Sequence, residues 1–178
     1  TKIKFPDLVD HMTAVDQCYF FKWFCKTMNF NNAIEIGIFT GASALSIAKG
    51  INGKLIGFDV STQYTDLGKS VWKKANVDKK IDLRIKPGIE GLKELLSDNN
   101  NIGNFDFAFV DAVKQEYGQY LELLYKLIRK NGIIAFDNTL LFGRVAEDEY
   151  ICDRSNYMKS FNKKLINDDR FDMAMISL

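Results

Sequence analysis

Short apolar runs alternate with amphipathic stretches along most of the chain. Apolar runs bounded by glycines and acids fit strands that are covered on both faces. The pattern predicts strands over Ala33–Gly37, Lys54–Val60, Ile81–Lys86, Phe105–Asp111, Ile133–Asn138 and Phe171–Ile176. Apolar positions at helical spacing predict helices over Val15–Met28, Ala42–Lys49, Gln63–Ala75, Gly88–Leu96, Tyr117–Arg129 and Asn156–Ile166. Asn131-Gly132 is interpreted as the cap that ends the fifth of these helices.

Regular alternation of strand and helix predicts an α/β fold with a doubly wound, mostly parallel sheet and helices on both faces. With 178 residues the chain fits one domain, residues 1–178. Within it we expect residues 1–31 to form an N-terminal helical segment, and residues 32–178 to form the cofactor-binding sheet with its substrate edge. The polar stretch Asp98–Asn101 is too short to be a domain linker.

The stretch Ala33–Gly41 is predicted to be a strand, a glycine loop and the start of a helix. Such a unit is a platform for nucleotide cofactors, because loop glycines let the backbone approach the ligand and the helix start offers free N–H groups. The alternative is an ordinary strand-to-helix turn. The spacing of Gly37 and Gly41 differs from the dinucleotide fingerprint, and the chain has no phosphate-binding loop motif. A ligand without a pyrophosphate is therefore favoured.

Two acids narrow the choice of cofactor. Glu35, just before the first glycine, disfavours an anion and suits a ligand that carries ammonium or sulfonium charge. Asp59, at the end of the second predicted strand, is placed to hold the two hydroxyls of a ribose. A cationic adenosine cofactor without phosphates fits S-adenosylmethionine.

Composition excludes several other classes of function. The formal net charge is +1, so nothing favours nucleic acid or an anionic membrane surface as a partner. No apolar run approaches the roughly 20 residues that span a bilayer, and the first residues do not resemble a secretory signal. Cys18, Cys25 and Cys152 lack metal-ligand spacing, which indicates free thiols and a cytoplasmic location. A single histidine, His11, argues against zinc sites and catalytic triads.

Four motifs resemble the cation-dependent O-methyltransferases of the caffeoyl-CoA and catechol O-methyltransferase type. The motifs are Glu35–Ser43, Gly57–Asp59, Phe105–Ala112 and Ala135–Leu140. The similarity runs from about Met12 to Arg170. It implies a class I methyltransferase sheet of Rossmann-like type, S-adenosylmethionine as methyl donor, and a homodimer.

The resemblance also assigns roles to single residues. It implies cofactor contacts at Thr13, Glu35, Gly37, Ser43, Asp59, Gly88 and Asp111. It implies that Asp111, Asp137 and Asn138 bind a divalent metal ion and that Lys114 is the catalytic lysine. Both assignments have a purely structural alternative. Lys114 could be a solvated lysine at the start of a helix, and Asp137-Asn138 could simply begin a turn.

The metal assignment also has physical support. The fourth and fifth strands of a doubly wound sheet are neighbours, so Asp111 and Asp137 should emerge side by side at one edge. Two adjacent carboxylates repel each other unless a cation or a proton lies between them. With the amide oxygen of Asn138 they form an all-oxygen set, which suits Mg²⁺ best, with Ca²⁺ or Mn²⁺ as alternatives.

Some positions depart from the family pattern. Val113 stands where the family has an aspartate, so one contact to the cofactor or to the lysine is expected to be missing. Leu141 stands where the plant enzymes have a tryptophan, with Phe142 as the candidate replacement, so caffeoyl-CoA itself is not favoured. The family's leading helices and last antiparallel strand are also expected to be missing, which would leave Phe171–Ile176 without its hairpin partner.

The sequence therefore predicts an S-adenosylmethionine-dependent and divalent-metal-dependent O-methyltransferase. Its acceptor would be a catechol-like small molecule, chelated by the metal and deprotonated by Lys114. The alternative is a binding protein on the same scaffold that holds S-adenosylmethionine without turnover. A nicotinamide-dependent oxidoreductase is disfavoured by the absence of the dinucleotide glycines.

Overall fold

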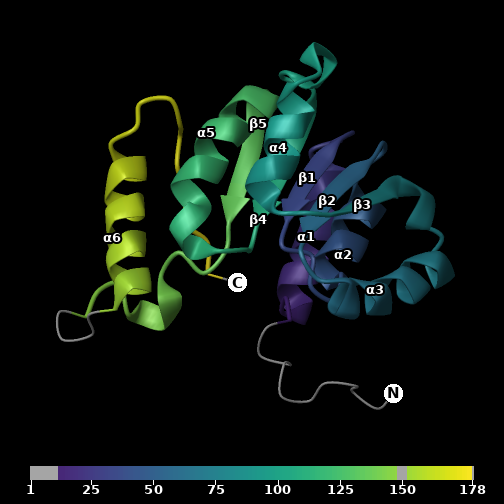
Figure 1. Ribbon diagram of the computed structural model, residues 1–178, viewed down its shortest axis with the longest axis horizontal. Helices are drawn as coiled ribbons and strands as arrows, with labels where there is room; N and C mark the ends of the chain where they lie inside the picture. Colours follow the sequence, from purple (N-terminus) through teal and green to yellow (C-terminus); the bar gives the residue numbers. More distant parts are fainter. Residues whose placement is uncertain (1–11, 148–151, 178) are drawn as a thin grey trace.

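The computed structural model describes residues 12–147 and 152–177 (Figure 1). Residues 1–11 of the predicted N-terminal segment, His11 among them, lie outside this range. The helices are α1 (Val15–Thr27), α2 (Ala42–Gly50), α3 (Thr62–Lys74), α4 (Gly88–Leu96), α5 (Tyr117–Leu127) and α6 (Asp153–Ile166). The strands are β1 (Ala33–Ile36), β2 (Leu55–Asp59), β3 (Ile81–Ile85), β4 (Phe105–Val110) and β5 (Ile128–Phe136). None of the helices in the described residues is long and apolar enough to cross a membrane.

The five strands form one parallel sheet in the order β3-β2-β1-β4-β5. Strand β1 lies in the middle and pairs with β2 on one side and with β4 on the other. The chain thus winds outward in one direction from β1 to β3 and in the other direction through β4 and β5. Ligands of such sheets bind at the carboxyl ends of the strands, where the winding reverses. The predicted doubly wound sheet is confirmed.

Helices cover both faces of the sheet, as the apolar strands require. In β4, Phe107 and Phe109 belong to a buried cluster with α1 and α2, whereas Ala108 and Val110 belong to a cluster with α4, α5 and α6. This alternation follows from the two-residue period of a strand. Figure 1 shows α5 and α6 on the left and α2 and α3 at the lower right. Every residue of β4 is buried, which fits a strand that has a helical layer on each side.

The predicted end of α5 is wrong. The helix ends at Leu127, and Asn131 and Gly132 lie inside β5 instead of capping the helix. Ile128 already pairs with Phe105, and the register shifts between Phe105 and Phe107. Asn131 adopts the left-handed conformation, with φ of 61°. The two residues that resemble a helix cap are therefore the irregular part of a longer strand, because the chain pairs with β4 directly after the helix ends.

The predicted last strand, Phe171–Ile176, is also wrong. Residues 171–177 have no regular secondary structure, and the described residues offer them no strand to pair with. Only Phe171 is anchored, since its ring lies 5.5 Å from that of Tyr125 on α5. Met173, Met175 and Ile176 are exposed. The alternating apolar pattern is present, but a strand also needs a partner for its backbone.

Candidate active site at the carboxyl edge of the sheet

The glycine loop after β1 connects the two predicted halves of the site. Gly37 has φ of 92°, and a Cβ atom there would lie 2.0 Å from the backbone oxygen of Asp111. Gly41 has φ of 76°, and its carbonyl accepts a 2.9 Å hydrogen bond from the indole N–H of Trp72. Glycine is required at Gly37 both by the backbone conformation and by the close approach of β4. The glycine loop after β1 and the residue that follows β4 are therefore in direct contact.

Asp59 organises the same loop. Its Oδ2 accepts hydrogen bonds from the backbone N–H groups of Ile38, at 2.9 Å, and Phe39, at 2.8 Å. Its Oδ1 accepts a 2.8 Å bond from the backbone N–H of Ser61. The sequence predicted the position of Asp59 at the end of β2, but not its hydrogen bonds to the backbone of the glycine loop. Three of the roughly four acceptor sites of the carboxylate are thus occupied, and the remaining one, on Oδ1, is available to a ribose hydroxyl.

Glu35 is a fully buried carboxylic acid in the middle of the sheet. Its Oε1 accepts a hydrogen bond from the hydroxyl of Ser43. Its Oε2 is buried and has no hydrogen-bond partner among the described residues. Burial raises the pKa of Glu35 to about 8, and the nearby charges of Asp111 and Asp59 raise it as well, against the effect of the Ser43 bond. A buried acceptor without a donor is costly, so this oxygen suits an ammonium donor from a ligand.

Gly88 and Thr13 are the two remaining cofactor residues of the prediction. Gly88 is buried at the start of α4, and a Cβ atom there would lie 2.5 Å from the Ile36 side chain at the end of β1. Thr13 is half-buried just before α1, and its carbonyl lies 4.0 Å from the sulfur of Cys18. The structure thus brings Gly88 to the edge where β1 ends. The hydrogen bonds found among the described residues do not join Thr13 to the other predicted residues.

Asp111 and Asp137 emerge side by side, as predicted. Val110 pairs with Phe136 in the sheet, and each of these residues is followed by one of the two aspartates. Burial raises the pKa of Asp137 above its usual range, and the negative charge of Asp111 raises it further. Asn138 has φ of 54°, and its backbone N–H donates a 2.7 Å hydrogen bond to Asp137 Oδ1. The two carboxylates therefore repel each other, and a cation between them would relieve this repulsion.

The donors fit a hard divalent ion better than a zinc ion. Residues 12–147 and 152–177 contain no group of three or more histidine, cysteine, aspartate or glutamate residues suited to a metal. The predicted set has two carboxylates, and its third member is the amide of Asn138. Oxygen-only sets of this kind suit Mg²⁺, which keeps several water or substrate oxygens in its shell.

Lys114 is buried beside the two aspartates, in the short turn that leads into α5. Its Nζ lies 2.8 Å from Asp111 Oδ1, 2.7 Å from the hydroxyl of Tyr117 and 3.5 Å from the carbonyl oxygen of Asp137. A solvated lysine at a helix start would not be held by two partners in this way. The geometry places an amine next to the predicted metal ligands.

Two further residues reach this cluster, and sequence reasoning missed both. Tyr117 is fully buried, and its hydroxyl lies 3.1 Å from the carbonyl oxygen of Val110 and 3.0 Å from that of Asp137. Burial raises the pKa of Tyr117 above its usual range. Gln17 of α1 hydrogen-bonds the side chain of Asp137. Tyr117 follows Lys114 by one turn, which is a usable signal, whereas nothing in the sequence connects Gln17 with Asp137.

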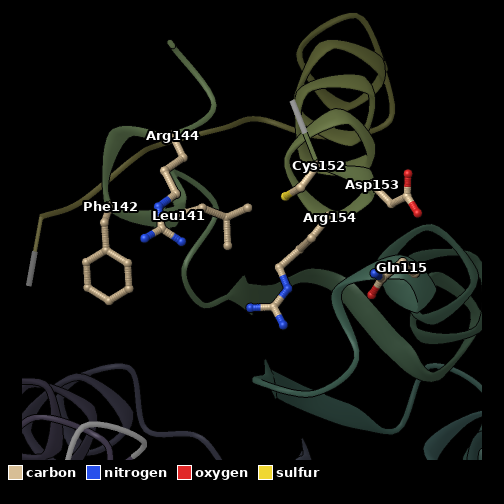
Figure 2. A pocket seen from close by; sticks show the side chains of 7 residues that line it. All are labelled: Gln115, Leu141, Phe142, Arg144, Cys152, Asp153 and Arg154. Atoms are coloured by element: carbon tan, nitrogen blue, oxygen red, sulfur yellow. The ribbon is translucent and has the colours of Figure 1, made fainter. Parts of the chain in front are cut away.

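A pocket of about 480 Å³ adjoins the cluster (Figure 2). It is lined by Gln115, Leu141, Phe142, Arg144, Cys152, Asp153 and Arg154. We call it the arginine pocket, because Arg144 and Arg154 reach it from two different segments. Gln115 directly follows Lys114 in the chain, so the pocket lies next to the predicted reaction site. Leu141 is buried, whereas Phe142 is 92% exposed, so Phe142 is the aromatic side chain that the described lining residues offer to this pocket.

Comparison with known proteins identifies the family. The sequence model of the O-methyltransferase family matches residues 2–178. A Dictyostelium discoideum protein named "Probable caffeoyl-CoA O-methyltransferase 1" is 41% identical over 170 residues, which span 94% of this chain and 74% of that protein.

Solved structures agree with this identification. An O-methyltransferase from Bacillus cereus in complex with S-adenosylhomocysteine superimposes with a TM-score of 0.83 at 25% identity, covering 92% of this chain and 74% of that one. The S-adenosylhomocysteine-bound methyltransferase PaMTH1 from Podospora anserina gives a TM-score of 0.82 at 26% identity, covering 97% of this chain and 78% of that one. The chain therefore belongs to the O-methyltransferase family, whose members use S-adenosylmethionine as methyl donor.

Proposed function

We propose that this chain methylates one hydroxyl of a catechol-like small molecule, with the help of a divalent metal ion and with Lys114 as general base. The observation that carries the proposal is the position of Lys114 Nζ, which is buried 2.8 Å from Asp111 Oδ1 and 3.5 Å from the Asp137 carbonyl. A general base must lie within hydrogen-bond reach of the proton that it accepts, and this position puts the Lys114 amine beside the proposed metal ligands at the ligand-binding edge of the sheet.

The cofactor is expected to lie across the end of β1. Glu35 Oε2, which is buried and without a partner among the described residues, would accept a hydrogen bond from the ammonium group of S-adenosylmethionine. Asp59 would hold the ribose, and Gly37 and Gly88 would present their backbone to the ligand at the ends of the strands. Thr13 and Ser43 complete the proposed set, the latter by fixing the Glu35 carboxyl.

The proposed metal ligands are the side chains of Asp111, Asp137 and Asn138. A bound hard ion would act as a Lewis acid that lowers the pKa of a chelated hydroxyl. The raised pKa of Asp137 supports this assignment, because burial and the neighbouring Asp111 disfavour its charge in the absence of a cation. Mg²⁺ fits the oxygen donors, with Ca²⁺ or Mn²⁺ as alternatives.

Lys114 supplies the proton acceptor. A free phenol has a pKa of about 10, so its ionisation at neutral pH costs about 4 kcal/mol. The acceptor O–H bond breaks, an N–H bond forms at Lys114 Nζ, and the electron pair remains on the acceptor oxygen. That oxygen then takes the methyl group from the sulfonium as the carbon–sulfur bond breaks. Positioning of donor and acceptor by the two halves of the site contributes most of the remaining rate enhancement.

The arginine pocket is the proposed place for the rest of the acceptor. Its guanidinium groups, from Arg144 and Arg154, favour an acceptor that carries an anionic group beyond the catechol ring. Relatives named caffeoyl-CoA O-methyltransferase match this chain over most of its length. Leu141 is buried, and among the described lining residues Phe142 alone presents an aromatic ring, so the fit to a caffeoyl group is expected to differ from that of the plant enzymes.

The test is methyl transfer by the purified protein from S-adenosylmethionine to small catechols, with Mg²⁺ or with excess chelator. The proposal predicts methylated catechol with Mg²⁺ and none after chelation. Turnover that survives exhaustive chelation would refute the metal assignment. Calorimetric binding of S-adenosylmethionine without turnover on any ortho-dihydroxy compound would favour the alternative of a binding protein.

A further inference from the structure

The hydroxyl of Tyr117 is the second anchor of Lys114, after Asp111. It lies 2.7 Å from Lys114 Nζ and within 3.1 Å of two backbone carbonyl oxygens, those of Val110 and Asp137. A hydroxyl has one proton to donate, and a carbonyl can only accept. The Tyr117 proton therefore goes to one of the carbonyls, and the phenolic oxygen accepts a hydrogen bond from Nζ.

We propose that Tyr117 is a positioning residue, which holds the Lys114 amine at the edge between β4 and β5 where the methyl acceptor binds. This inference rests on the proposed function in one respect, the role of Lys114 as base. A lysine side chain has four rotatable bonds, so a single anchor leaves its amine free to move around that anchor. Asp111 and Tyr117 are the two close partners of Nζ, at 2.8 and 2.7 Å, whereas the Asp137 carbonyl lies farther away, at 3.5 Å. The acceptor hydroxyl would take the side of the nitrogen that the two close partners leave open.

Position 113 cannot provide this second anchor. Val113 has no polar group, and its side chain is exposed. Asp111 is itself a proposed metal ligand, so its oxygens would be shared between the ion and the lysine. Tyr117 has no such competing role, and its two carbonyl partners belong to the backbone of the same two strand ends. Tyr117 thus links the Lys114 amine, through its hydroxyl, to the backbone at the ends of β4 and β5.

The ring of Tyr117 is fixed by packing against two other aromatic rings, so its hydroxyl has a defined position. Its centroid lies 4.9 Å from that of Phe136 and 5.7 Å from that of Phe161. A phenylalanine would keep these contacts and remove the hydroxyl alone. The Val110 carbonyl would still accept the 3.0 Å hydrogen bond from the backbone N–H of Asp137. Tyr117→Phe is therefore expected to fold and to test the hydroxyl specifically.

The experiment measures kcat and KM of Tyr117→Phe with S-adenosylmethionine, Mg²⁺ and a small catechol. Loss of the second anchor should lower kcat about tenfold or more, within the range that a general base contributes. The KM values for both substrates and the Mg²⁺ concentration for half-maximal rate should stay within about twofold. The matched control is Tyr120→Phe, which removes another buried hydroxyl from α5, one bound to Glu116 instead of the lysine. It should keep kcat within about twofold.

A double variant separates positioning from general loss of structure. In a Lys114→Met background, Tyr117→Phe should cause no further loss of kcat, because residues that act as a unit are not additive. An equal loss in both backgrounds, a wild-type kcat for Tyr117→Phe, or a shifted Mg²⁺ requirement would each overturn the inference. If Lys114→Met itself keeps the wild-type kcat, the proposed base fails and the inference fails with it. If Lys114→Met lowers kcat but Tyr117→Phe does not, the positioning role of Tyr117 is refuted while the proposed base remains.

Discussion

The buried acid Glu35 makes the stability of the ligand-free protein depend on pH in a predictable direction. Its pKa is about 8 in the folded protein and 4.5 in its ordinary state. The folded protein therefore holds this proton over a pH range in which the unfolded chain has released it. Stability falls as pH rises from about 4.5 to about 8 and is unaffected by this group below that range.

The expected size follows from the difference between the two pKa values. At pH 7 the unfolded chain gains about 3 kcal/mol from ionisation that the folded protein forgoes, at about 1.4 kcal/mol per pH unit. Glu35→Gln removes this pH-dependent contribution to the free energy of unfolding, because an amide is neutral at every pH. The amide oxygen can still accept the Ser43 hydrogen bond. The variant should therefore gain stability relative to the wild type as pH rises, by an amount on the order of 3 kcal/mol at pH 7.

The assay is urea unfolding of both proteins without ligand, followed by far-ultraviolet circular dichroism at pH 5, 6, 7 and 8. The difference in unfolding free energy between variant and wild type cancels the titration of other groups. Glu90→Gln, an exposed carboxylate on α4, is the control and should shift stability by less than about 0.5 kcal/mol throughout. A difference between Glu35→Gln and wild type that is flat with pH, or that moves in favour of the wild type as pH rises, would refute this explanation.

Three further variants test the remaining parts of the site. Gly37→Ala should lose S-adenosylmethionine binding in calorimetry and unfold at lower temperature, since a Cβ atom would overlap the Asp111 carbonyl at 2.0 Å. Gly143→Ala, with φ of 88° and nothing within 4 Å, is the control for backbone strain alone, and equal losses in both would contradict the overlap. Asp137→Ala should abolish Mg²⁺-dependent turnover, and a rate that keeps its Mg²⁺ dependence would count against the metal site. Arg154→Ala should raise KM about tenfold for a carboxylate-bearing catechol and leave neutral catechol unchanged, whereas equal effects on both would argue against charge recognition.

The sequence was sufficient for most of the fold because its strands are buried on both faces. Such strands have nearly continuous apolar sequences with clear ends, and the acids after them mark the carboxyl edge. The pairing of β4 with β5 then brought Asp111 and Asp137 together as expected. The link from Gly37 to Asp111 could not be foreseen, because it depends on how closely the two strand ends approach.

The sequence-based predictions were wrong where the secondary structure of a segment depends on which other segment it packs or pairs with. Asn131-Gly132 has the local composition of a helix cap, but pairing of Ile128 with β4 turns it into an irregularity within β5. Phe171–Ile176 has an alternating pattern, but the described residues give it no strand to pair with. In the sequence Tyr117 is only the first residue of a predicted helix, and the position of its hydroxyl in the structure reveals the contact with Lys114.

The most direct test of the central claim compares Lys114→Met with the wild type in transfer of a radiolabelled methyl group from S-adenosylmethionine to catechol at saturating Mg²⁺. We expect kcat to fall by about 10²- to 10⁴-fold. Calorimetry should find S-adenosylmethionine affinity unchanged, because Lys114 is assigned to proton transfer and not to cofactor binding. A variant that turns over at the wild-type rate would contradict the account, as would one whose lost activity is explained by lost cofactor affinity.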